Sequence, residues 1–83
     1  MSYYVYMLKS QGAKPITYVG YTKDIKERLI LHNSGKGAKF TRGRKWKLKY
    51  FKSYEKKIIA MREEYKLKKN YKLRKMIKLG DVN

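Results

Sequence analysis

The chain opens with two runs dense in β-forming residues, Tyr3-Tyr-Val-Tyr-Met-Leu-Lys9 and Ile16-Thr-Tyr-Val-Gly-Tyr21. Each run is too short for a stable helix, so both are predicted to be strands. The segment Gln11-Gly-Ala-Lys-Pro15 between them is rich in turn residues and indicates an antiparallel hairpin. We expect this hairpin to bring Tyr6 and Tyr18 close together.

A helix is predicted to follow the hairpin. Asp24 precedes Glu27 by three residues, which resembles a capping box with aspartate as the cap, and the helix should end near Asn33-Ser-Gly35. Four of its residues fall at i, i+3, i+4 and i+7, which predicts one stripe facing the protein: Ile25, Arg28, Leu29 and His32.

The second half of the chain adds one strand and two helices. Residues 34–45 form a basic loop without periodicity, and Trp46–Tyr54 begins with the alternation typical of a strand. A long helix is predicted over Glu55–Lys69, where Ile58, Met61 and Tyr65 recur at helical spacing beside Ala60 and Leu67. Asn70 caps a last helix over Tyr71–Leu79, which we expect to bury Leu73, Met76 and Ile77 and to stop at Gly80.

These elements predict an α+β fold, with a three-stranded antiparallel sheet flanked by helices in the order β-β-α-β-α-α. The length of 83 residues favours a single domain over residues 1–83. Twenty-three Lys and Arg residues against six acidic ones give a formal charge of +17, which indicates a polyanionic partner, most simply nucleic acid. Because the charges are scattered and no apolar run is long enough to span a bilayer, we expect no membrane association and a cytoplasmic location. The absence of cysteine excludes thiolate metal sites and thiol nucleophiles.

Several separated stretches together resemble one known family. Tyr4-Val-Tyr6, then Tyr18-Val-Gly20, then a helix carrying Arg28 and His32 resemble the core of the GIY-YIG nucleases, with Tyr4 in place of the glycine of the family name. The closest resemblance is to the small stand-alone bacterial members related to the excinuclease subunit that cuts DNA. Two further stretches are characteristic of that subgroup: His32-Asn-Ser-Gly-Lys-Gly-Ala-Lys-Phe-Thr-Arg42 and Arg62-Glu-Glu-Tyr-Lys-Leu-Lys-Lys69.

The resemblance implies a DNA endonuclease that uses one Mg²⁺ or Mn²⁺ ion to hydrolyse a phosphodiester. It assigns Tyr6 as the general base, with Tyr18 as its hydrogen-bond partner or an alternate base, and we expect a nearby cation or a metal-bound water to lower the cost of ionising the phenol. It further implies that Arg28 holds the scissile phosphate, which suits a guanidinium, and that His32 supports either the phosphate or the tyrosine pair. Glu64 is the implied metal ligand, although helical spacing alone does not separate it from Glu63.

The glycine-rich stretch of the basic loop lacks the spacing of a nucleotide-binding loop, so no small-molecule cofactor is expected. Four of its side chains are predicted to contact the backbone of DNA or RNA: Lys36, Lys39, Arg42 and Arg44. Phosphate contacts carry no sequence information, so specificity would come from the structure of the DNA, as in repair or processing, or from a protein partner. The alternative function is a catalytically weak nucleic-acid-binding protein with the same fold.

Overall fold

The computed structural model describes residues 2–80, and its central layer is a three-stranded antiparallel sheet. The strands are β1 (Tyr3–Ser10), β2 (Thr17–Thr22) and β3 (Trp46–Tyr54), in the spatial order β2-β1-β3. β1 lies in the middle and is hydrogen-bonded to a strand on each side, whereas β2 and β3 are the edge strands. The α+β class and the order β-β-α-β-α-α predicted from the sequence are confirmed.

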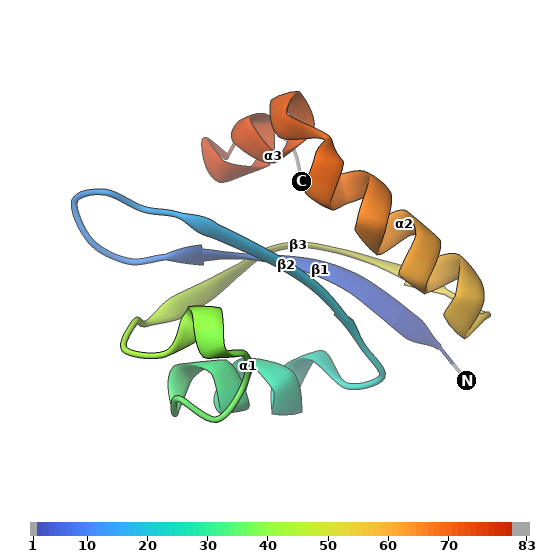
Figure 1. The fold of residues 1–83 in the computed structure, drawn as a ribbon, viewed down its shortest axis with the longest axis horizontal. Coiled ribbons are helices and arrows are strands. Elements are labelled where there is room, and N and C mark those ends of the chain that lie inside the picture. Colours follow the sequence, from blue (N-terminus) through green and yellow to red (C-terminus); the bar gives the residue numbers. More distant parts are fainter. Residues whose placement is uncertain (1, 81–83) are drawn as a thin grey trace.

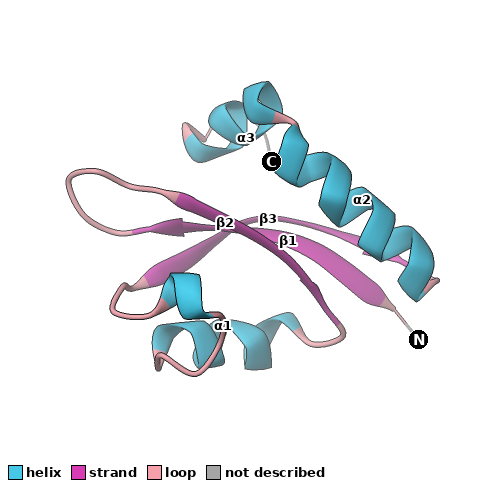
Figure 2. Cartoon of the chain, in the orientation of Figure 1, coloured by secondary structure: helices cyan, strands magenta, loops and turns pink. Residues whose placement is uncertain are grey.

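Helices cover both faces of the sheet (Figures 1 and 2). Helix α1 (Ile25–Asn33) lies on one face, and α2 (Lys57–Lys69) and α3 (Tyr71–Lys78) lie on the other. Within residues 2–80, no helix combines the length and the apolar character that crossing a bilayer requires.

Two of the helices begin at side-chain caps. The Asp24 carboxylate accepts a hydrogen bond from the Glu27 N–H at 3.0 Å, as predicted. The return bond of a capping box does not form, because the Asp24 N–H donates to Thr22 Oγ1 at 3.2 Å. At α3, the Asn70 side chain accepts from the Leu73 N–H at 3.1 Å, which confirms the predicted cap.

Alternate residues of β1 supply two separate cores. Val5 and Met7 pack with Val19 toward α2 and α3, while Tyr6 and Leu8 pack toward the side of α1. Both faces are covered, so the run from Val5 to Leu8 is buried throughout rather than at every second residue.

The apolar stripe noted on α2 does not face the sheet. Ile58, Met61 and Tyr65 are 63%, 43% and 61% exposed, whereas Ala60 and Leu67 are buried. The small Ala60 side chain, 0% exposed, lets the helix approach the sheet closely. Hydrophobicity alone would favour the larger residues, so the buried face is set by fit and not by apolar area.

The expected burial of Met76 is wrong, because its side chain is 47% exposed. Helix α3 buries a stripe four residues apart, formed by Leu73 and the fully buried Ile77. Met76 is rotated away from this stripe by about 100°, the turn that one helical residue makes.

The loop after α1 is held at both ends and is more structured than the sequence indicates. It contains a short 3₁₀ helix, η1 (Lys39–Thr41), which the sequence does not predict because three residues leave no periodicity to detect. The Asn33 side chain accepts from the Trp46 N–H at 2.6 Å and donates to the Trp46 carbonyl at 3.2 Å. The Trp46 indole N–H donates to the Thr41 carbonyl at 3.0 Å. These bonds fix the loop against the start of β3.

Replacing Ile77 with alanine should lower the free energy of unfolding by about 2–5 kcal/mol, because it opens a cavity under α3. The matched change Met76→Ala should cost less than about 1 kcal/mol, because that side chain is half exposed. Urea unfolding followed by circular dichroism measures both values. Equal losses from the two variants would contradict the packing of α3.

Candidate active site

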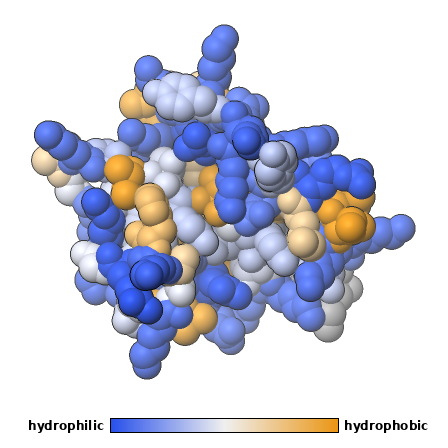
Figure 3. All heavy atoms as spheres, in the orientation of Figure 1, coloured by the Kyte–Doolittle hydropathy of each residue, from blue (hydrophilic) through white to orange (hydrophobic). Residues whose placement is uncertain are grey.

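A cavity of about 520 Å³ lies over β2, where residues of α1 and α2 approach from opposite faces of the sheet. Figure 3, in the orientation of Figure 1, shows a largely hydrophilic surface with pale residues of intermediate hydropathy near its middle and scattered apolar residues beside them. The lining residues are Tyr3, Tyr6, Tyr18, Gly20, Tyr21, Thr22, Lys23, Asp24, Glu27, Arg28, Lys57 and Glu64. The cavity therefore contains four of the five residues for which the family resemblance implies chemistry, the exception being His32.

A buried chain of hydrogen bonds begins at Tyr6 and fixes the tautomer of His32. The Thr41 hydroxyl donates its one hydrogen to the Ala38 carbonyl at 2.8 Å, so Thr41 Oγ1 accepts from His32 Nδ1–H, also at 2.8 Å. A neutral imidazole carries one N–H. His32 Nε2 therefore accepts from the Tyr6 hydroxyl at 2.8 Å. The Ala38 N–H also approaches Nδ1, but at 3.5 Å it is too far to compete.

The environment of Tyr6 favours the neutral phenol. Burial raises the pKa of Tyr6 well above its usual range, and the nearby Tyr18 and Glu64 raise it further. The Arg28 charge acts in the opposite direction but is outweighed. The Arg28 charge does ease ionisation of this phenol, as expected, but desolvation has the larger effect and leaves the pKa of Tyr6 raised.

The environment of His32 also favours a neutral side chain. Burial lowers the pKa of its imidazole, and the Arg28 charge lowers it further. Its side chain is 1% exposed, so it lies out of reach of a phosphate in the cavity. Of the two supporting roles left open for His32, the geometry favours contact with the tyrosine pair.

Tyr18 lies beside both of these groups. Its ring centroid is 6.4 Å from that of Tyr6 and 5.0 Å from that of His32. The strand register places Gly20 opposite Tyr6 and Tyr18 opposite Leu8, so the two tyrosines are diagonal neighbours on one face of the hairpin.

Two glycines make room for the Tyr6–His32 pair. A Cβ at Gly20 would lie 2.6 Å from the Tyr6 hydroxyl oxygen, and a Cβ at Gly37 would overlap the His32 ring. Neither position can carry a side chain unless the ring beside it moves. The glycine after Tyr18-Val19 is thus required by the close approach of Tyr6.

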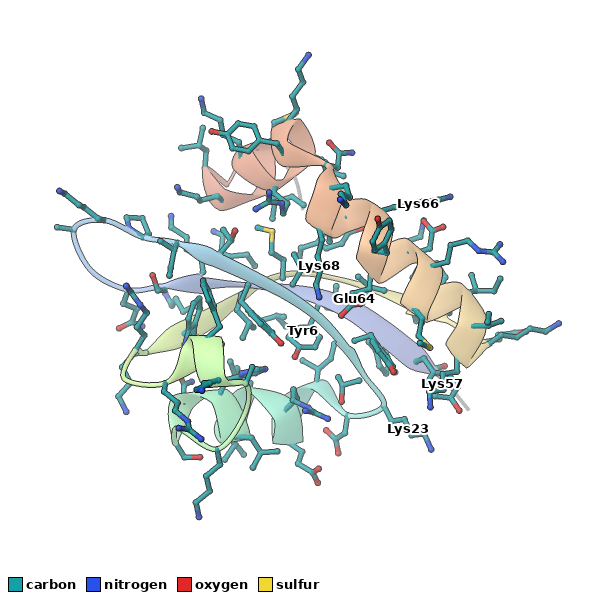
Figure 4. All side chains as sticks on the ribbon, viewed as in Figure 1. Tyr6, Lys23, Lys57, Glu64, Lys66 and Lys68 are labelled. Atoms are coloured by element: carbon teal, nitrogen blue, oxygen red, sulfur yellow. The ribbon has the colours of Figure 1, made fainter. Side chains whose placement is uncertain are left out.

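Arg28 and Glu64 enter the cavity from opposite sides of the sheet. Arg28 is exposed at the rim, so the expectation that its whole stripe faces the protein is wrong at this position. Figure 4 shows Glu64 and Lys68 pointing from α2 toward the sheet, and their charged groups lie 3.6 Å apart. Glu63 lines a different cavity and pairs with Lys66 at 3.2 Å. The structure thereby separates the two glutamates that helical spacing could not.

The donor set of the cavity fits one hard divalent cation. Half of the six acidic residues of the sequence line it: Asp24, Glu27 and Glu64. Among the described residues, no three His, Asp or Glu side chains converge as a metal cluster. Mg²⁺ needs only one or two carboxylates because it keeps several of its waters. Glu64, whose side chain is 18% exposed, is a carboxylate whose charge raises the pKa of Tyr6.

The sequence did not identify the two lysines that line this cavity, and the basic residues that it did predict lie outside the cavity. Lys57 lies seven residues before Glu64 and thus on the same helical face, a spacing that could have identified it. Lys23 comes from the loop after β2 and has no periodic signal. The four basic residues predicted to contact DNA are exposed, but none of them lines the cavity: Lys36, Lys39, Arg42 and Arg44.

Comparison with known proteins gives a consistent result. A family model described as the GIY-YIG catalytic domain matches residues 2–77. A UPF0213 protein of Oceanobacillus iheyensis is 43% identical over 67 residues, which cover 80% of this chain and 76% of that protein. One from Bacillus pumilus is 46% identical over 68 residues, covering 81% and 67%. The solution NMR structure of a UPF0213 protein from Bacillus halodurans matches with a TM-score of 0.53 and 39% identity, covering 95% of this chain and 85% of that one.

His32 is the sole histidine of the sequence, so its titration can be measured directly. Nitrogen NMR should show the Nδ1–H tautomer and a pKa below the usual value of about 6.5. Because the unfolded chain binds this proton more readily, the stability present above pH ~6.5 should fall as the pH drops through the folded pKa. Urea unfolding should show this loss in the native chain and not in His32→Gln. An Nε2–H tautomer would contradict the bonding described here.

Proposed function

The chain belongs to the GIY-YIG nuclease family, and we propose that it is a divalent-metal-dependent endonuclease that hydrolyses phosphodiesters of DNA during repair or processing. The observation that carries this proposal is the Tyr6–His32 hydrogen bond at the wall of a cavity that also holds Arg28 and Glu64. Hydrolysis of a phosphodiester needs an activated water and stabilisation of the charge on the phosphoryl oxygens, for which Tyr6, Arg28 and a cation held by Glu64 are the candidates.

Tyr6 acts as the base without first becoming a phenolate. Its hydroxyl already donates to the neutral His32 Nε2, so its own proton can move to the imidazole as the phenol oxygen takes a proton from the attacking water. This coupled transfer avoids the isolated phenolate that burial disfavours. It places a positive charge on His32 only transiently, because burial and Arg28 lower the pKa of that imidazole and favour release of the proton. Thr41 holds the imidazole in the tautomer that can accept. Tyr18 borders the same space and is the alternate base.

Arg28 binds the scissile phosphate. Its guanidinium is exposed at the cavity rim, carries a permanent charge and offers two parallel donors. Lys23 and Lys57 border the same cavity and add positive charge where the phosphoryl oxygens would lie. These three groups position the DNA and stabilise charge that develops during hydrolysis.

Glu64 would hold the divalent cation, since a hard cation such as Mg²⁺ needs only one or two carboxylates. When bound, the ion supplies Lewis-acid stabilisation to the phosphoryl group. The Lys68 ammonium group lies 3.6 Å from the Glu64 carboxylate, so Lys68 would have to yield this contact for Glu64 to hold a cation. The Glu64 side chain is already held toward the sheet by that contact.

The basic loop supplies affinity beyond the cavity. Lys36, Lys39, Arg42 and Arg44 are exposed beside η1 and contact phosphates, which fix position but carry no sequence information. Selection of the substrate then depends on the shape of the DNA or on a protein partner. A catalytically weak nucleic-acid-binding protein is the second candidate, and the net charge of +17 supports it equally well.

Replacing Glu64 with glutamine should reduce nicking of branched or single-stranded DNA in Mg²⁺ by about 100-fold or more, because the carboxylate that holds the ion is removed. Tyr6→Phe should cause a loss of similar size, since it removes the proton acceptor. Glu63→Gln is the matched control and should retain activity, because Glu63 lines another cavity.

The same three variants separate the two candidate functions. Equal trace cleavage by the native chain, Tyr6→Phe and Glu64→Gln, together with unchanged DNA binding, would establish the weak-binding alternative. A loss in Glu63→Gln equal to that in Glu64→Gln would instead contradict the assignment of the metal ligand.

The contribution of the basic loop can be read from the salt dependence of duplex binding. The double variant Lys39→Gln, Arg42→Gln should reduce the slope of log K against log salt by roughly 1.8, or about 0.9 for each phosphate that the protein no longer neutralises. Lys66→Gln, Lys69→Gln removes the same charge from α2 and should leave the slope nearly unchanged. Equal slopes for the two double variants would show that net charge alone drives binding.

A further inference from the structure

A second groove adjoins the candidate active site. It has a volume of about 340 Å³ and also lies along β2, with Tyr18 as a wall shared with the first cavity. Helix η1 contributes to it from one face of the sheet, and α2 and α3 contribute from the other. Its lining residues are Thr17, Tyr18, Val19, Phe40, Lys68 and Arg74.

Phe40 gives this groove an exposed aromatic surface. Its side chain is 57% exposed, although it is an apolar residue in a loop that is otherwise basic. The ring stacks on Tyr18 with centroids 6.0 Å apart and an angle of 25° between the planes. Phe40 is therefore held in a fixed orientation beside the active site while much of its surface remains available.

Two cations lie across the groove from this ring. The Arg74 guanidinium lies over the Tyr71 ring, with Cζ 5.9 Å from the ring centroid, and its Nη1 donates one long hydrogen bond to Thr17 Oγ1 at 3.4 Å. Lys68 borders the same groove, and its ammonium group reaches the Glu64 carboxylate at 3.6 Å. Because Arg74 lines the groove and its Nη atoms make one long hydrogen bond among the described residues, its guanidinium has further N–H groups to donate to an anionic ligand.

We propose that this groove binds an unpaired nucleotide next to the cleaved bond, with its base on Phe40 and its phosphate at Arg74 and Lys68. An exposed aromatic ring opposite positive charge is the combination that holds single-stranded nucleic acid, because every base has a face that can stack. The inference rests on the proposed nuclease function and names its substrate class.

Because Tyr18 lines both cavities, a DNA strand that occupies the active site and the groove must place neighbouring nucleotides in them. A base stacked on Phe40 has left its own helix. Extruding a paired base costs free energy for unpairing and unstacking, whereas an unpaired base avoids the cost of unpairing. The substrate is therefore DNA with an unpaired nucleotide beside the cut, such as a single strand, a flap or a junction, and not a continuous duplex.

Binding of a short single-stranded oligonucleotide that contains 2-aminopurine tests the stacking of the base on Phe40. In EDTA, Phe40→Ala should weaken binding at least about fivefold and abolish the fluorescence quenching that stacking causes. Phe51→Ala is the matched control, because Phe51 is 55% exposed on β3 and lines neither cavity along β2. Affinity for a duplex of the same length should not change in either variant.

The binding of phosphate is tested with Arg74→Gln, compared with Lys66→Gln, which removes one charge outside the groove. Arg74→Gln should weaken single-strand binding several-fold more than the control. Arg74→Lys restores the charge and should recover part of the affinity, which separates binding from a defect in folding.

Equal single-strand affinity and quenching in the native chain and Phe40→Ala would overturn the inference. Equal weakening by Phe40→Ala and Phe51→Ala would do so as well. Neither outcome bears on the proposed hydrolysis, which depends on Glu64 and Tyr6. Conversely, loss of single-strand binding in Phe40→Ala without cleavage by the native chain would leave the groove assigned and the nuclease function refuted.

Discussion

The hydrogen bond between Tyr6 and His32 is the constraint on which the rest of the site depends. It joins the middle strand of the sheet to α1, and the imidazole extends it to Thr41 in η1. A buried phenol and a buried imidazole are costly unless both are paired. Satisfying them fixes the helix and the following loop against the sheet. The positions of Arg28 and Phe40 at the surface follow from that buried pair.

The opposite face of the sheet supplies the acidic part of the site. Ala60 and Leu67 of α2 pack in the core. Glu64 lies between them on the same side of the helix, so it reaches the cavity beside β2. The site is therefore assembled from both outer layers across the edge of the sheet. In a chain with a charge of +17, half of the six acidic residues lie at this edge, where Lys23, Arg28 and Lys57 line the same cavity and balance their charge.

The strands and helices could be predicted because their signals are local: β-rich runs, caps at Asp24 and Asn70, and uninterrupted helical stretches. The site was harder to predict from the sequence, because burial and side-chain contact depend on the tertiary structure. The stripe containing Ile58 was the most apolar on α2, yet the fit of Ala60 decides which side meets the sheet. Nothing in the sequence shows that burial outweighs the effect of the Arg28 charge on the pKa of Tyr6. Residue types at family positions indicated which groups meet, but not their protonation states.

The two glycines beside the buried pair place a condition on how this chain can change over evolutionary time. Gly20 is confined by the ring of Tyr6, and Gly37 is confined by the ring of His32. If either ring were replaced by a small side chain, the adjacent glycine would be released from its steric constraint. A lineage that abandoned hydrolysis would thus be free to acquire larger residues at both glycine positions. Glycine at both positions in a relative would then indicate that the buried tyrosine–histidine pair is retained, without reference to the reacting groups themselves.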